Sequence, residues 1–384
     1  MPHNCPLSLS TLLIDQQTVT PVAPGAMQFF VNILENIGFS CQLLPFDDLD
    51  GQPTENLFAT IGSGSPHLLF AGHMDVVPTG DTALWSSPPF KATEHNNMLV
   101  GRGTSDMKCA IACFVAAVAR LKESESLPQG TISLLITGDE EGNSINGTRK
   151  ALAALKDKGI SFDAALVGEP TSVEKLGDMV KVGRRGSVMF HVTITGKQGH
   201  VAYPHLANNP ITALNHLITA LTKEPLDHGT EFFDASNLEV VNIAGGEGVD
   251  NVIPHSATAT INIRFNDSYT SDKLISWFSD HCHAIASQCN VACDFTKRVS
   301  GESFLSTPGA FCDIVTNAIK ENTGIDATRS TTGGTSDARF IKDYAPTVEL
   351  GMLNATAHQI DEAVSLDDIE SLCSIYQTII KQFA

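Results

Sequence analysis

The pattern of hydrophobic and polar positions predicts alternating strands and helices in the first part of the chain. Residues 67–72 form a short continuous apolar run, which is typical of a strand covered on both faces. Residues 107–124 are mostly small and apolar and predict a buried helix. Residues 131–137 and 164–168 are two further apolar runs that predict strands. Such alternation indicates an α/β domain with a largely parallel sheet and helices on both faces.

The middle of the chain predicts a second domain, made of four strands and two helices. In chain order these segments are 187–195, 210–223, 237–243, 256–265, 271–288 and 291–296. The order β-α-β-β-α-β is that of a ferredoxin-like α+β sandwich. Because the first pattern returns afterwards, we expect an inserted domain at 185–297 within a first domain made of 1–184 and 298–384.

Charge limits the partners of this chain. Its 384 residues include 43 acidic and 24 basic side chains, which give a net charge of −19. This charge argues against nucleic acid and anionic membrane surfaces as partners, since both would be repelled. An anionic substrate would not be attracted by the overall field either, so local arginines would have to hold it.

The cellular location follows from features that the chain lacks. The N-terminal residues do not combine a basic stretch with an apolar core and a cleavage site, and no apolar run is long enough to span a bilayer. The nine cysteines have no regular spacing, which favours reduced thiols. We therefore expect a cytoplasmic protein.

Acidic and histidine residues follow the predicted strands at the points where these strands end. Five segments contribute, carrying His73 with Asp75, Asp106, Glu140 with Glu141, Glu169, and His358. Ligands of open α/β sheets bind outside the carboxyl ends of the strands, so these side chains are expected to meet. Taken singly, each has an ordinary explanation, such as a helix cap at Asp106, but their joint order favours a site.

The residue types indicate zinc. Imidazoles together with carboxylates suit zinc, whereas calcium and magnesium favour oxygen ligands alone. His73 and Asp75 share a face of an extended chain, so Asp75 is placed to orient the ring of a metal-binding His73. In the adjacent pair Glu140 and Glu141, one carboxylate can bind a metal while the other acts as general base on a water. This pattern predicts hydrolysis at a two-metal site.

The chain resembles the co-catalytic zinc peptidases and deacylases, a family that includes aminoacylases, glutamate-releasing carboxypeptidases and acetylornithine deacetylase. The resemblance rests on the motifs GHMDVVP (72–78), GRGTSDMK (101–108), TGDEEG (137–142), VGEP (167–170) and ATAH (355–358). Four more segments resemble the branch that hydrolyses N-succinyl-LL-2,6-diaminopimelate in lysine biosynthesis. They are VGRRGS (182–187), GKQGHVAYPHLANNP (196–210), DNVIP (250–254) and TTGGTSDARF (331–340).

This resemblance implies a ligand set. His73 and Glu169 would bind one zinc ion, Glu141 and His358 the other, and Asp106 would bridge them. Cobalt could replace zinc at one of the two positions. Glu140 is implied as the general base, and Asp75 as the support of His73.

The resemblance also implies a homodimer formed through the inserted domain, in which His200 reaches the partner's site and stabilises the oxyanion. The positions implied to hold substrate are Arg184, Ser187, Tyr203, Asn251, Arg264, Thr335 and Arg339. A guanidinium pairs with a carboxylate through two hydrogen bonds, so these arginines would hold the anionic N-acyl amino acid. One departure is Glu247 in the turn 245–254, where a smaller, threonine-containing run is expected.

Two other functions remain open from the sequence. A related deacylase acting on N-acetylornithine or another N-acyl-amino acid would share the metal site, but the arginine set counts against it. A non-catalytic binding homologue would share the fold, but the intact ligand set and Glu140 count against it.

Overall fold

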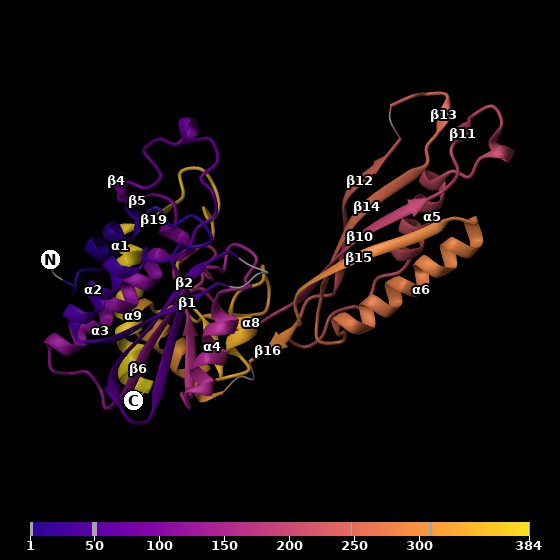
Figure 1. Ribbon diagram of the computed structural model, residues 1–384. Coiled ribbons are helices and arrows are strands. Elements are labelled where there is room, and N and C mark those ends of the chain that lie inside the picture. The colour runs from indigo at the N-terminus through magenta and orange to yellow at the C-terminus, as the bar shows by residue number, and fades with distance from the viewer. Residues whose placement is uncertain (1–2, 48–51, 247, 307–308, 384) are drawn as a thin grey trace. The chain divides into compact units, whose positions relative to one another are not determined.

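The computed structural model describes residues 3–47, 52–246, 248–306 and 309–383 (Figure 1). The chain forms two units. The first comprises Met1–Val182, Ser306–Ser330 and Ser336–Ala384, and the second comprises Gly183–Leu305 and Thr331–Thr335. The second unit thus extends beyond the segment 185–297 expected from the sequence, and it includes a short segment that returns to it near the end of the chain.

The first unit is built on an eight-stranded sheet with the strand order β1-β2-β6-β3-β7-β18-β8-β17. The strands are β1 Ser40–Phe46, β2 Thr54–Ser63, β3 His67–His73, β6 Gly130–Thr137, β7 Ala164–Val167, β8 Met179–Lys181, β17 Thr328–Ser330 and β18 Thr347–Glu349. The central strands β6, β3, β7 and β18 run parallel to one another. Because parallel strands are covered on both faces, β3, β6 and β7 are continuous apolar runs. The prediction of a largely parallel sheet is confirmed.

Helices flank this sheet. They are α1 Pro6–Ile14, α2 Gln28–Ile37, α3 Cys109–Glu123, α4 Thr148–Asp157, α7 Ala310–Thr323, α8 Ala338–Ile341 and α9 Leu366–Phe383. Figure 1 shows α1, α3 and α9 on one side of the strands and α4 and α8 on the other. The small side chains of α3 let it lie buried on nearly all sides, and its Phe114 stacks on Phe70 of β3 and contacts Tyr376 of α9. A small sheet, made of β4 Thr93–His95, β5 Met98–Val100 and β19 Ala363–Ser365, completes the first unit.

The second unit has the connectivity predicted from the sequence. Its elements are β10 Gly186–Thr195, α5 Pro210–Leu221, β12 Asn237–Gly245, β14 Ser256–Phe265, α6 Ser271–Cys289 and β15 Ala292–Gly301. The antiparallel strand order is β12-β14-β10-β15, as in a ferredoxin-like sandwich. The core lies between sheet and helices, where Phe190 of β10 stacks on Phe278 of α6. The short strands are β9 Gly183–Arg184, β11 Gly199–His200, β13 Val252–Ile253 and β16 Phe304–Leu305.

Two further features concern the chain as a whole. Among the described residues, no helix is long and apolar enough to cross a membrane. All nine cysteines lie in the described part of the chain, and each is a free thiol.

Candidate metal centre

Three neighbouring parallel strands end at one cluster of ionisable side chains. His73 is the last residue of β3, Glu140 and Glu141 follow the end of β6, and Glu169 follows the end of β7. Since β3 lies between β6 and β7, their carboxyl ends meet at the same edge of the sheet. The cluster therefore lies where open α/β sheets bind ligands.

Two loops complete the cluster. Asp106 lies between β5 and α3, in a segment where its own backbone leaves the helical conformation. His358 lies in the loop between β18 and β19, and its backbone is left-handed, with φ +63°. Residues from five separate segments, 285 positions apart at the extremes (73 to 358), thus meet in the first unit.

Asp106 lies between the two histidines. Its Oδ1 is 2.9 Å from His73 Nε2, and its Oδ2 is 3.2 Å from His358 Nε2. His73 Nε2 is also 3.8 Å from Glu169 Oε1, and His358 Nε2 is 2.8 Å from Glu141 Oε1. One oxygen of Asp106 therefore faces each side of the cluster, as a bridging carboxylate requires.

The donor atoms form two overlapping groups. Ligand atoms of His73, Asp106 and Glu141 lie within 4.8 Å of one another, and so do those of His73, Glu140 and Glu169. Imidazole nitrogen and carboxylate oxygen in such groups suit zinc and similar divalent metals. The residues thus fit a metal centre.

The electrostatics of the cluster favour a bound cation. Burial disfavours the charged form of His73, but Asp106 and Glu169 outweigh this effect and raise its pKa well above the usual value. Hydrogen bonds to Asp106 and Glu141 raise the pKa of His358 to about 10. Burial opposes ionisation of Asp106, but hydrogen bonds from His358 and His73 lower its pKa. The carboxylates thus create a negative potential that a divalent cation would neutralise.

The Asp75 side chain acts differently from the expectation. His73 Nδ1 lies 2.8 Å from the main-chain oxygen of Asp75 and 3.8 Å from its Oδ1, so the carbonyl orients the ring. The carboxylate instead accepts the backbone N–H groups of Glu140, at 3.0 Å, and Glu141, at 2.9 Å. Burial raises the pKa of Asp75 to about 6. Asp75 therefore links the end of β3 to the segment that carries the two glutamates.

Glu140 lies beside the metal-ligand candidates with a carboxyl group in an acidic environment. Burial, followed by the charges of Glu169 and Asp337, raises the pKa of Glu140 well above the usual value. A raised pKa brings a carboxylate closer to the range in which it accepts a proton near neutral pH. The arrangement suits a general base.

Arg339 also belongs to the first unit. Its guanidinium donates to Ser144 Oγ at 2.9 Å, lies over the Phe340 ring, and approaches Asp337 at 3.9 Å. Ser144 is bound in turn to the carbonyl of Glu140. The structure thus places this substrate-binding candidate beside the loop that carries the candidate base.

Four other substrate-binding candidates lie together in the second unit. Ser187 of β10 pairs in register with Arg264 of β14, and Arg264 donates to Thr335 Oγ1 at 3.1 Å. Arg184 donates to the carbonyl of Gly334 at 2.9 Å. These residues therefore form one cationic cluster that suits a carboxylate, with the guanidinium groups of Arg184 and Arg264 and the hydroxyl groups of Ser187 and Thr335.

His200, Tyr203 and Asn251 lie at a different end of the second unit. His200 is in β11, which pairs with β13, and the Asn251 carbonyl accepts the N–H of Val201 at 3.1 Å. The rings of His200 and Tyr203 are in edge contact, and both residues are exposed. The structure thus separates these three residues from the cationic cluster.

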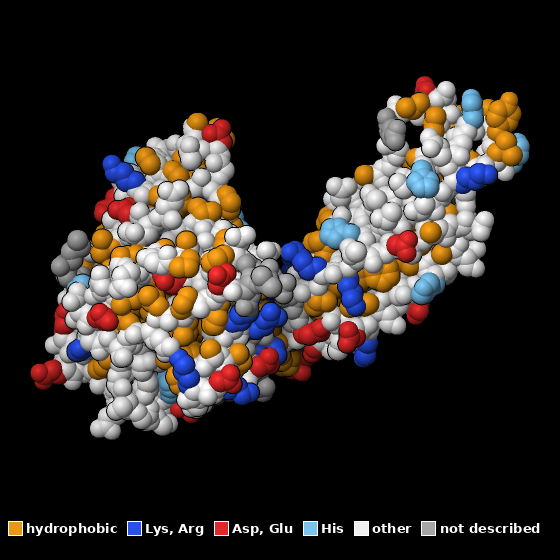
Figure 2. Space-filling view, viewed as in Figure 1, with side chains coloured by type: hydrophobic (Ala, Val, Ile, Leu, Met, Phe, Trp, Pro, Cys, Tyr) orange, Lys and Arg blue, Asp and Glu red, His pale blue; other side chains and the backbone are white. Residues whose placement is uncertain are grey.

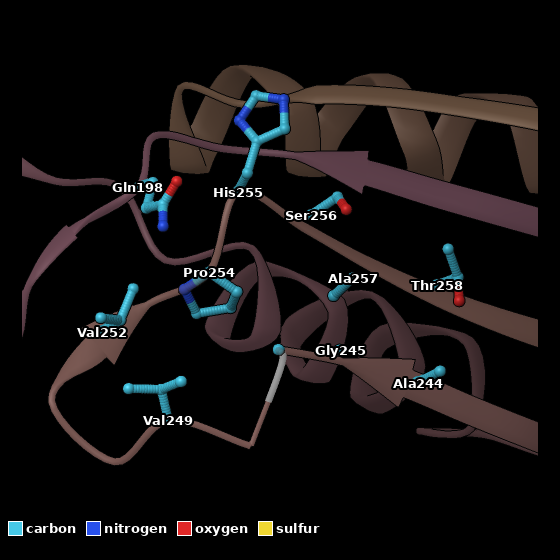
Figure 3. Close-up of a pocket in the computed structure, with 11 residues that line it drawn as sticks. Gln198, Ala244, Gly245, Val249, Val252, Pro254, His255, Ser256, Ala257 and Thr258 are labelled. Atoms are coloured by element: carbon cyan, nitrogen blue, oxygen red, sulfur yellow. The ribbon is translucent and has the colours of Figure 1, made fainter.

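Glu247, the noted departure from the family pattern, lies outside the described residues. The neighbouring residues line a hollow of about 280 Å³ in the second unit (Figure 3). It is bordered by the end of β12, the start of β14 and the segment with Val249, Val252 and Pro254. The side chains of His255 and Gln198 line one side of this hollow.

A buried ion pair that contacts the candidate ligand segments was not predicted from the sequence. Arg102 Nη1 donates to Glu362 Oε2 at 2.8 Å, and both side chains are almost fully buried. The only signal was the position of Arg102 inside the motif GRGTSDMK; nothing in the sequence near Glu362 indicated a partner 260 residues away.

Known proteins resemble this chain along its whole length. A desuccinylase of Parvibaculum lavamentivorans, named succinyl-diaminopimelate desuccinylase, is 48% identical over 98% of this chain and 95% of its own length. A protein of the same name from Pelagibacter ubique is 45% identical, with full coverage of both chains.

Solved structures share the fold at lower identity. The aminopeptidase PepT of Bacillus cereus has a TM-score of 0.82 at 20% identity, covering 99% of this chain and 98% of its own. The M20 family metallo-carboxypeptidase Sso-CP2 of Sulfolobus solfataricus has a TM-score of 0.80 at 16% identity, covering 98% and 99%. The family model described as peptidase family M20/M25/M40 matches residues 69–382. The chain therefore belongs to peptidase family M20/M25/M40.

Proposed function

We propose that this protein is a two-zinc amide hydrolase that converts N-succinyl-LL-2,6-diaminopimelate to succinate and LL-2,6-diaminopimelate. The observation that carries the proposal is the position of Asp106 between His73 and His358, with Glu140 beside them. The substrate is supported by relatives of nearly equal length that bear the name succinyl-diaminopimelate desuccinylase.

The short distances from His73 to Glu169 and from His358 to Glu141 support the ligand assignment that the resemblance implied. His73 and Glu169 would hold one ion, Glu141 and His358 the other, and Asp106 would bridge them; cobalt could replace zinc at one position. When bound, the two ions polarise the amide carbonyl and lower the pKa of a water molecule. Glu140 accepts a proton from that water and returns it to the leaving amine.

His200 supplies a hydrogen-bond donor to the oxyanion. The backbone N–H of Ala202 donates to His200 Nδ1 at 3.0 Å, so Nδ1 is an acceptor and Nε2 carries the proton in the neutral ring. An N–H donor aimed at the developing negative charge is what an oxyanion site requires. The exposed position of the ring leaves that donor accessible.

The cationic cluster of Arg184, Ser187, Arg264 and Thr335 binds the carboxylate of the substrate. Burial, together with the charge of Arg185, lowers the pKa of Arg264. A half-buried cation of this kind is stabilised by an anionic partner. We assign Tyr203, Asn251 and Arg339 to the remaining polar groups of the substrate.

A homodimer forms through the second unit. Its β12 is an edge strand with two well-exposed apolar side chains, Val241 (57%) and Ile243 (60%). Figure 2 shows further hydrophobic side chains gathered at the end of this unit near β11 and β13. The exposed apolar residues there include Val201, Tyr203, Leu206 and Val249. An edge strand and apolar patches of this kind are suited to pairing with a second copy.

The reaction takes place in the cytoplasm. The nine free thiols fit a reducing compartment, in which disulfides rarely form. The overall negative charge also disfavours binding to nucleic acid and to anionic membranes.

The substrate is tested by kcat/KM of the zinc-loaded protein on N-succinyl-LL-2,6-diaminopimelate and on N-acetylornithine. We expect a preference of about 10²-fold or more for the succinyl compound, because N-acetylornithine lacks the succinyl carboxylate that Arg184 and Arg264 would bind. A preference for N-acetylornithine would identify a different deacylase of the family. Absence of turnover on both compounds, in protein that binds zinc, would favour the non-catalytic homologue.

The ligand assignment is tested by titrating the apo-protein with Zn²⁺ in a calorimeter. We expect two ions per chain in the wild type, and in Glu141→Gln a loss of affinity at one position by about 10²-fold or more, since even residues behind the ligands contribute roughly 10–100-fold. Glu94→Gln is the control, because Glu94 is an exposed residue of β4. A single ion in the wild type, or an unchanged second site in Glu141→Gln, would contradict the assignment.

A further inference from the structure

Glu362 is a buried carboxylate, outside the candidate ligand set, that receives hydrogen bonds from the segment carrying Asp106. Its Oε1 accepts the backbone N–H groups of Ser105, at 2.8 Å, and Asp106, at 3.0 Å. Its Oε2 accepts the N–H of Gly103, at 2.9 Å, and Arg102 Nη1, at 2.8 Å. The exposed fraction of Glu362 is 0%.

These four hydrogen bonds define what Glu362 can do. An ionised carboxylate has about four lone-pair sites, and all of them are used here. Glu362 therefore has no lone pair with which to bind a metal ion or accept a proton from water. Its contacts hold the main chain on both sides of Ser105, including the N–H of Asp106 itself.

The same pair is also tied to the segment that carries His358. Arg102 Nη1 donates to the carbonyl of Gln359, the residue after His358, at 3.1 Å. The N–H of Gly101 donates to the main-chain oxygen of Glu362 at 2.9 Å, and the pairing of β5 with β19 continues from there. The segments of Asp106 and His358 are thus joined through both the backbone and the buried ion pair.

The loop of His358 needs such support. His358 and Asp361 have left-handed backbones, with φ of +63° and +57°. For residues other than glycine, such conformations are unfavourable and persist where the surroundings hold them. Asp361 Oδ1 accepts the N–H and the hydroxyl of Ser86, and Arg102 holds the carbonyl of Gln359. The His358 backbone therefore depends on contacts made elsewhere in the first unit.

We propose that Glu362 is a positioning residue that sets the distance between Asp106 and His358, and so the geometry of the metal position that these two residues share. The proposal rests on the metal centre proposed above. A purely structural ion pair would contribute to the stability of the fold without affecting the affinity for metal. The two roles therefore differ in what they predict for the apo-protein and for the loaded protein.

The test substitution is Glu362→Gln. Glutamine has the same length as glutamate, but an amide NH₂ group, which is a donor, replaces one of the two carboxylate oxygens. Each of these oxygens accepts hydrogen bonds from two donors in the wild type, so the amide NH₂ group would face two donors. The hydrogen bonds on that side are lost, and the Asp106 segment or Arg102 must move. The matched control is Glu55→Gln, because Glu55 is buried and accepts the backbone N–H groups of Gly25 and Met27, both at 2.8 Å, in a segment without candidate ligands.

The experiment compares Zn²⁺ affinity, the visible absorption spectrum of the Co²⁺-loaded protein, and the unfolding temperature of the apo-protein. We expect Glu362→Gln to weaken one Zn²⁺ position by about 10–100-fold and to change the Co²⁺ spectrum. Glu55→Gln should lower the apo unfolding temperature to a similar degree and leave both metal properties unchanged. Equal Zn²⁺ affinity and an unchanged Co²⁺ spectrum in Glu362→Gln would overturn the proposal.

Two further outcomes are decisive. If Glu362→Gln does not fold, Arg102→Lys carries the same test, because lysine keeps the charge opposite Glu362 but loses the planar guanidinium whose Nη1 donates to both Glu362 and the Gln359 carbonyl. An unchanged Co²⁺ spectrum in folded Arg102→Lys would then refute the positioning role. A wild-type protein that binds no Zn²⁺ would instead refute the metal centre, and the positioning role with it.

Discussion

Replacing Glu140 by Gln is expected to lower kcat by about 10²–10⁴-fold while both metal ions still bind. General acid–base catalysis contributes roughly this factor, and an amide side chain cannot accept the proton of the attacking water. Glutamine keeps the length of the side chain, and the N–H of residue 140 can still donate to Asp75. The local backbone should therefore remain in place.

The measurement is kcat together with a Zn²⁺ titration of the same preparation. Glu141→Gln is the informative comparison, because the adjacent residue should lose metal affinity as well as activity. Glu140 also lies within 4.8 Å of donor atoms of His73 and Glu169, so a ligand role is the main alternative. Loss of an ion in Glu140→Gln would assign Glu140 to the metal, and wild-type kcat would exclude it as the base.

The strand pattern accounts most directly for one part of the predicted site. His73, Glu140, Glu141 and Glu169 follow apolar runs, and neighbouring parallel strands bring their carboxyl ends to one edge. The connectivity of the second domain could also be predicted from the sequence, since its alternating strands and amphipathic helices follow the order β-α-β-β-α-β. In these cases a local pattern carries the tertiary information.

Other contacts depend on the folded loops and have no local pattern. The i, i+2 spacing of His73 and Asp75 was correct for proximity, but the carbonyl rather than the carboxylate orients the ring. The spacing could not show that the N–H groups of Glu140 and Glu141 would compete for that carboxylate. Spacing alone cannot rank a main-chain acceptor against a side-chain acceptor.

Contacts between residues far apart in the sequence could not be predicted either, because no local pattern indicates them. Arg102 and Glu362 meet only because β5 pairs with β19, and these strands are too short to be predicted from the sequence. The segment 331–335 belongs to the second unit although its neighbours on both sides belong to the first. Its contacts with Arg184 and Arg264 are made by a loop, whose position no periodicity encodes.

The proposed dimer makes a prediction for a mixture of two inactive variants. His200→Ala alone should lower kcat by about 10²–10³-fold, the range for removal of one oxyanion donor. In the proposal, His200 acts at the site of the partner, whereas Glu140 acts within its own chain. A heterodimer of Glu140→Gln and His200→Ala therefore contains one site with an intact Glu140 and an intact His200.

Co-refolding equal amounts of the two variants is expected to restore about a quarter of the wild-type rate, because about half of the dimers are mixed and each has one complete site. Each variant refolded by itself is the control and should stay inactive. If His200 acted within its own chain, every site in the mixture would lack either Glu140 or His200, and no activity would return. Recovery of activity therefore requires a dimer in which His200 of one chain acts at the site of the other. A mixture as inactive as the separate variants would show that His200 acts within its own chain or that no dimer forms.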